Sequence, residues 1–231
     1  QKRLKINQNS KNMDFFDDLL NSSTLPTERI SKMLDEDLFW QIVENSLFDA
    51  DNLNDQEKYL SKELENLVAE DIIGFQLRLE YNLYLLHTPE AWCAACIMND
   101  DTDVHHFFYF KSWVISQGQE LFEKTILHPD NLAEYFDEGF NDDDLYEFEN
   151  FNMIADNVFY EKFEHKIIDF IDKNFFQYLT QNSPKPEFDW DDENLASLQA
   201  ICPTLFQIFV EDYSPEDEDY DDEEDEDFDD E

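Results

Sequence analysis

Glycine is scarce in this chain, with only three glycines among 231 residues. Phosphate-binding loops, dinucleotide fingerprints and nucleophile elbows need several glycines at fixed spacings, because their backbones adopt conformations that other residues resist. None of these patterns occurs in the sequence. This shortage argues against the common nucleotide-binding and hydrolase folds and weakens the case for an enzyme.

Cysteine is also scarce, and Cys93, Cys96 and Cys202 are spaced too unevenly for a disulfide framework. The count fits a reducing compartment, so we expect a cytoplasmic protein. No stretch approaches the roughly eighteen uninterrupted apolar residues of a membrane helix, and no membrane segment is expected. Residue 1 is Gln, and starts at Met13 or Met33 stay open as alternatives.

Positive charge is the third shortage, since 15 Lys and Arg stand against 58 Asp and Glu and the formal net charge is −43. Fourteen of the sixteen residues from Glu216 to Glu231 are acidic. Such a field repels phosphate backbones and anionic membranes and attracts cations and basic proteins. We therefore expect a basic protein partner and no direct binding of nucleic acid or membranes.

Apolar residues are present in sufficient number for a continuous core, at 42% of the chain, and 16% of residues are aromatic. They recur at helical spacing, and most prolines stand where one periodic segment gives way to the next. The sequence predicts an all-α fold, a single irregular bundle of about eight to ten short helices. We expect residues 1–30 to be a loosely ordered extension, 31–212 the helical domain and 213–231 a disordered acidic tail.

Turn and cap residues place several helix ends. Thr88 and Pro89 are typical of a helix start, and Gly118 is typical of the residue after a helix. The segment 89–98 is rich in Ala and Cys and should be the most buried element. The apolar spacing predicts helices from near residue 31 and over about 55–67, 70–86, 89–98, 103–117, 119–127, 145–159, 160–179 and 192–210, with a short one after Pro129. The last of these is expected to be bent or divided by Pro203.

Several local stretches resemble one known family. They are Asp35-Glu36-Asp37-Leu38-Phe39-Trp40, Trp92-Cys93-Ala94-Ala95, Phe107 to Gly118, His128-Pro129-Asp130-Asn131-Leu132 and Cys202-Pro203-Thr204-Leu205-Phe206. Together they are similar to the bacterial domain-of-unknown-function family 4240 over roughly residues 34–210. The resemblance implies a helical intracellular domain with no assigned reaction.

Two departures from that family concern charged positions. Lys111 stands where the family usually has Arg, so the planar fork for bidentate carboxylate pairing is absent. Asp103, Val104 and His105 stand where the family tends to have Ser-Asp-Asp. Any chemistry of those family carboxylates would therefore not carry over intact.

The densest group of potential ligands is Asp100, Asp101, Asp103, His105 and His106. Asp and His together bind divalent metals or supply acid and base groups. Asp at the start of a helix is also what an N-cap requires. Capping by solvent-exposed residues is the preferred interpretation, and a metal-assisted enzyme built on Asp101, Asp103 and His105 is the alternative.

Lys111 and Gln117 are the polar positions on an otherwise aromatic helix. Such a helix can line a ligand pocket, because pockets combine apolar walls with a few polar groups. The simpler interpretation pairs Lys111 with a carboxylate at the helix surface and assigns Phe107, Phe110 and Trp113 to the core. Both stay open, so Lys111 and Gln117 join Asp101, Asp103 and His105 as a candidate functional surface.

The remaining acidic and thiol motifs are interpreted as structural. Cys93-x-x-Cys96 lacks the further ligands of a zinc site and fits core packing, and Asp142, Asp143 and Asp144 lack the pattern of a calcium loop. No catalytic residue, metal ligand or cofactor is assigned. The function that these observations favour is a non-enzymatic acidic interaction protein, either an immunity- or antitoxin-like inhibitor or a nucleic-acid mimic.

Overall fold

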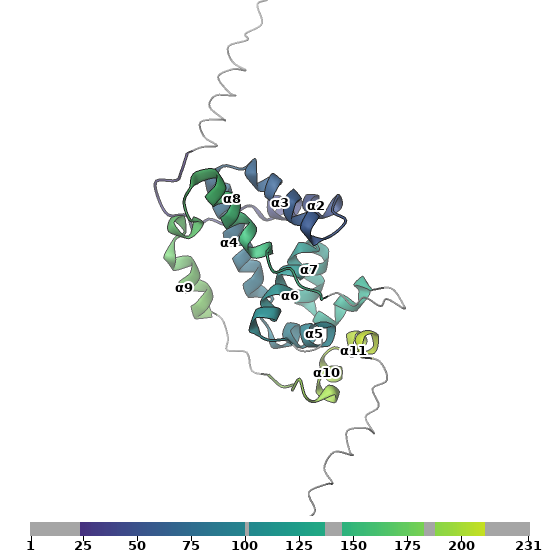
Figure 1. Cartoon of the computed structure of the whole chain (residues 1–231). Helices are drawn as coiled ribbons and strands as arrows, with labels where there is room; N and C mark the ends of the chain where they lie inside the picture. Colours follow the sequence, from purple (N-terminus) through teal and green to yellow (C-terminus); the bar gives the residue numbers. More distant parts are fainter. Residues whose placement is uncertain (1–23, 100–101, 137–144, 183–187, 211–231) are drawn as a thin grey trace, which may run out of the picture.

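The computed structural model describes residues 24–99, 102–136, 145–182 and 188–210 (Figure 1). Within these ranges the prediction of an all-α fold is confirmed, and the one β-feature among them is an isolated parallel bridge between Ile30 and Ile171. The α-helices in this part of the chain are α2 Glu36–Phe48, α3 Leu53–Glu65, α4 Ala69–Leu85, α5 Pro89–Asn99, α6 Val104–Ser116, α7 Gln119–Leu127, α8 Ile154–Phe163, α9 Lys173–Asn182, α10 Leu195–Ile201 and α11 Pro203–Phe209. Short 3-10 helices occur at η1 Pro129–Tyr135, η2 Phe151–Met153 and η3 Ile167–Phe170.

The expected acidic tail, residues 213–231, and most of the expected N-terminal extension, residues 1–23, lie outside the described residues. Within the described ranges, no helix combines the length and the apolar composition needed to cross a membrane.

Local capping explains where several helices begin and end. Thr88 Oγ1 accepts a hydrogen bond from the backbone N–H of Ala91, and Pro89 occupies the first helical position, where its missing N–H is not needed. Gly118 has φ +100° between α6 and α7, a conformation that favours glycine. These predicted boundaries are confirmed.

The prediction of two helices over 145–159 and 160–179 is wrong. Glu164 adopts a left-handed conformation with φ 59° and ends α8. Farther along, the backbone N–H of Asp172 donates to Ile30 O at 2.8 Å, and Ile30 N–H donates to Phe170 O at 2.7 Å. Because these backbone groups bond to a distant segment, Ile171 is extended and interrupts the predicted helix between η3 and α9, despite the helical apolar spacing.

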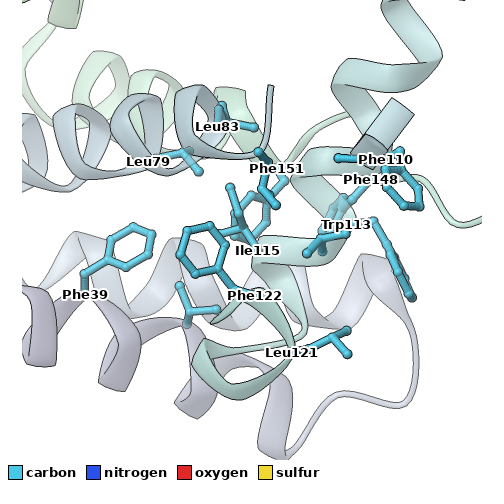
Figure 2. Close-up of a cluster of buried hydrophobic side chains, with 14 of the residues drawn as sticks. Phe39, Leu79, Leu83, Phe110, Trp113, Ile115, Leu121, Phe122, Phe148 and Phe151 are labelled. Atoms are coloured by element: carbon cyan, nitrogen blue, oxygen red, sulfur yellow. The ribbon is translucent and has the colours of Figure 1, made fainter. Parts of the chain in front are cut away.

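The core lies between α2, α4, α6 and α7, and Figure 2 shows their side chains converging on a common interior. Phe110, Val114 and Ile115 of α6 are fully buried in it, and Trp113 is 5% exposed. Phe148 and Phe151 reach the same interior from the segment before α8. In α5, eight of eleven residues are buried, which agrees with the prediction made from its small side chains.

Gly74 lets the segment before α2 approach α4 closely. Its carbonyl oxygen accepts a hydrogen bond of 2.8 Å from the backbone N–H of Leu34. A Cβ atom at position 74 would lie 2.9 Å from that same nitrogen, closer than ordinary packing permits. The start of α2 is therefore held against the central helix by a contact that requires glycine.

Candidate functional site

Asp103 caps α6, as the preferred interpretation expected. Its Oδ1 accepts hydrogen bonds from the backbone N–H groups of His105 and His106, at 2.7 and 2.9 Å. These bonds favour the carboxylate and hold the pKa of Asp103 below its usual range. Both histidine side chains are exposed. This capping role is sufficient to explain why an aspartate occurs at position 103.

The metal-site alternative needs Asp101, which lies outside the described residues. Among the residues that are described, no three His, Cys, Asp or Glu side chains converge as metal ligands would. Cys93, Cys96 and Cys202 are buried free thiols. The predicted burial of Cys93 and Cys96 in the core is confirmed.

The environment of Lys111 in the structure differs from the one predicted from the sequence. The side chain is 6% exposed, so the predicted ion pair at the helix surface is wrong. Its Nζ donates to Leu83 O at 3.5 Å and lies 3.3 Å from His87 Nδ1, over the rings of Phe107 and Phe108. Within the described residues no carboxylate oxygen lies within 4 Å of Nζ. The physical reason is that this face of α6 packs against the C-terminal end of α4.

Burial controls the charge of the groups around Lys111. It lowers the pKa of Lys111 to about 8, an effect that the nearby charge of Glu80 partly offsets. It also lowers the pKa of His87, which the lysine charge lowers further. Burial raises the pKa of Glu80, whose Oε1 accepts a hydrogen bond from Gln76. At neutral pH the lysine is therefore mainly charged and the imidazole neutral.

A cavity of about 400 Å³ opens beside Lys111, and we call it the lysine cavity. Much of its wall is apolar, contributed by side chains of α6 and by Met153. Its polar groups include Lys111, His87, His105 and Glu149. Glu149 is exposed and lies 3.5 Å from the hydroxyl of Tyr109. The cavity thus has one buried cation and an acidic group in contact with solvent.

Gln117 belongs to a different hollow, of about 440 Å³, at the other end of α6. Its Oε1 accepts a hydrogen bond of 2.9 Å from the hydroxyl of Tyr135, and its Nε2 donates to Ser116 Oγ. The ring centroids of Tyr135 and Tyr146 lie 5.8 and 5.2 Å from that of Trp113. We call this site the aromatic hollow. In it, Gln117 holds Tyr135 in place.

Gln56 of α3 adds an unpaired acceptor to the aromatic hollow. The residue is 1% exposed, and its Nε2 donates to Ser116 O at 2.7 Å. That carbonyl can only accept, so the amide orientation is fixed, and Oε1 has no partner among the described residues. Asp51 lines the same hollow and is exposed. Asp51 therefore offers an entering donor a charged acceptor, whereas Gln56 Oε1 is a neutral acceptor that is closed to solvent.

The candidate residues do not form one site. Lys111 and His105 line the lysine cavity, Gln117 lines the aromatic hollow, and the two share no lining residue. His87 and Gln56 are not recognisable as site residues from the sequence, because neither stands in a motif with the residues that it contacts in the fold.

A comparison with protein-family models finds a match to the family described as protein of unknown function (DUF4240), over residues 34–161. That segment includes Lys111, Gln117, His87 and Gln56. Comparisons with curated proteins and with solved structures find no match. The predicted resemblance to this family is confirmed over the matched segment.

Proposed function

The chain belongs to the DUF4240 family, whose description assigns no activity, and we propose from its own geometry that it is a non-enzymatic binding protein for a basic segment of a partner protein. The aromatic hollow receives a Lys or Arg side chain of that segment. The acidic surface attracts the partner before contact.

The charge of the described residues supports this proposal. They contain 31 Asp and Glu against 10 Lys and Arg, so the helical body is acidic without the C-terminal segment. A surface of one sign accelerates association with an oppositely charged partner, and salt weakens the effect. Charge alone does not define where the partner binds.

The observation that carries the proposal is the make-up of the aromatic hollow, where the rings of Trp113, Tyr135 and Tyr146 lie beside the exposed carboxylate of Asp51. The hollow is also lined by Gln56, whose buried Oε1 has no hydrogen-bond partner among the described residues. A buried acceptor without a hydrogen bond costs about 1–3 kcal/mol. Because Oε1 is closed to solvent, an ammonium or guanidinium group in the hollow removes that cost when the Gln56 amide shifts toward it. A ligand that only accepts hydrogen bonds does not remove the cost of this unpaired acceptor.

The aromatic rings favour the same kind of ligand. A cation over an aromatic face is attracted by about 0.5–1 kcal/mol when exposed and by about 2 kcal/mol when desolvated. Of the three rings that line the hollow, Trp113 and Tyr146 are buried, while Tyr135 is 50% exposed. Asp51 adds a carboxylate for a donor that remains partly in water. Rings and acceptors together select a cationic side chain over a neutral one.

The test is fluorescence anisotropy with a labelled peptide of alternating Gly and Lys, compared with the same peptide carrying acetylated lysines. We expect the unmodified peptide to bind and the acetylated one to bind at least roughly tenfold more weakly. Tyr135→Ala should weaken binding of the unmodified peptide by roughly tenfold. Tyr160→Ala is the matched control, because Tyr160 is 57% exposed on α8 and lies outside the hollow.

Two results would contradict the proposal. Equal binding of the two peptides would show that lysine charge is not recognised. Equal effects of Tyr135→Ala and Tyr160→Ala would show that the peptide responds to the general acidic field and that the aromatic hollow is not its site.

A further inference from the structure

Lys111 is a buried cation whose charge the fold does not fully compensate. In the described part of the chain, its contacts are a long hydrogen bond to Leu83 O, the Nδ1 atom of His87 and two ring faces. Burying an ammonium group without an anionic partner is unfavourable. A methionine of similar length would fill the same space at lower cost. Among the described residues, this position therefore leaves the lysine charge open to an anionic partner.

The lysine cavity provides room for such a partner. Its volume of about 400 Å³ lies within the range of roughly 300–1,000 Å³ for small-molecule sites. Phe107, Phe108, Val104 and Met153 supply apolar wall, and Val104 and Met153 are among the exposed apolar side chains. Apolar walls around one buried charge match a ligand that has an apolar body and one group of opposite charge.

We propose that the lysine cavity is a binding site for a small organic anion, a carboxylate carried on an apolar body. The carboxylate pairs with Lys111 Nζ, and the apolar body lies against Phe107, Phe108 and Met153. This site is separate from the aromatic hollow, so it stands independently of the function proposed above.

The other titratable groups near the cavity are compatible with an anion. His87 is a neutral acceptor, and its lowered pKa keeps it so at neutral pH. Glu80 accepts a hydrogen bond from Gln76, and the cavity lining does not include it. Glu149 and His105 are exposed, so solvent screens their charges. Lys111 is the buried charge that a ligand meets, and it repels an amine.

The experiment is isothermal titration calorimetry of the full chain with octanoate, octan-1-ol and octylamine, which share an apolar body and differ in the head group. We expect octanoate to bind the wild type at least about tenfold more tightly than octan-1-ol or octylamine. Lys111→Met should weaken octanoate binding at least about tenfold and leave octan-1-ol binding unchanged. Lys124→Met is the control, since it removes one positive charge from surface ion pairs of α7.

A second measurement needs no variant. NMR titration of the lysine side chains should show octanoate raising the pKa of Lys111 from about 8, because a bound carboxylate favours the charged amine. Equal binding of octanoate and octan-1-ol by the wild type would overturn the proposal. Unchanged octanoate affinity in Lys111→Met, or an unchanged pKa of Lys111 with octanoate bound, would overturn it as well.

Discussion

The Nζ atom of Lys111 lies 3.3 Å from the Nδ1 atom of His87. Nδ1 is an acceptor only in the neutral tautomer that carries its proton on Nε2. Burial favours that state because it lowers the pKa of the imidazole, and the lysine charge lowers it further. The contact between α6 and the residues just after α4 therefore places a charged lysine against an uncharged histidine.

Lys111→Met should be more stable than the wild type at pH 7. The pKa of Lys111 is about 8 in the folded chain, against 10.5 for an unperturbed lysine. At a pH where the lysine is protonated in both the folded and the unfolded chain, this difference lowers the free energy of unfolding by about 3 kcal/mol. Between pH 8 and 10.5 the unfolded chain binds more protons, and wild-type stability should rise relative to the variant. Urea unfolding across this range measures the difference, with Lys124→Met as control. Parallel stability curves for wild type and Lys111→Met would contradict the prediction.

Trp113→Ala should destabilise the protein by about 3–5 kcal/mol, because the ring is 5% exposed and its loss leaves a cavity in the core. Tyr135→Ala removes an exposed ring of the same hollow and should cost less than about 1.5 kcal/mol. Urea unfolding of the two variants gives the comparison. A stable Trp113→Ala protein would show that this tryptophan serves the aromatic hollow and not the core.

Asp103→Ala should lower the melting temperature, because two backbone N–H groups at the start of α6 lose their acceptor. Asp103→Asn should retain most of the wild-type value, since an amide oxygen also caps helices. Thermal unfolding followed by circular dichroism compares the two. The loss of an activity or a bound metal in a stably folded Asp103→Asn protein would support the metal-assisted alternative over capping.

Gly74→Ala should lower the melting temperature although alanine favours helices. The intrinsic gain is about 1 kcal/mol, but the new methyl group meets the backbone nitrogen of Leu34 at 2.9 Å. That nitrogen also donates to Gly74 O, so the segment cannot retreat without losing the bond. If Gly74→Ala proves more stable than the wild type, the approach of this segment to α4 is not required by the fold.

Local signals in the sequence account for much of the helical architecture. Thr88 and Pro89 start α5, Asp103 caps α6 and Gly118 separates α6 from α7, as predicted. Each of these features depends on hydrogen bonds and backbone preferences within a few residues. The same holds for the apolar spacing that places Phe110 and Trp113 in the core.

The lysine cavity and the aromatic hollow are both formed by contacts between segments that lie far apart in the sequence. Lys111 is buried because Leu83 in the last turn of α4 and His87 just after α4 pack against it. Nothing near position 111 in the sequence distinguishes that lysine from one at a surface. Gln56 contributes to the aromatic hollow because its amide bonds to Ser116, sixty residues along the chain. The sequence alone determined the all-α class, several caps and much of the apolar core, because these follow from short-range backbone geometry and periodicity. Only the tertiary structure decided which polar groups are buried without a full set of partners, since that depends on how helices pack across the fold.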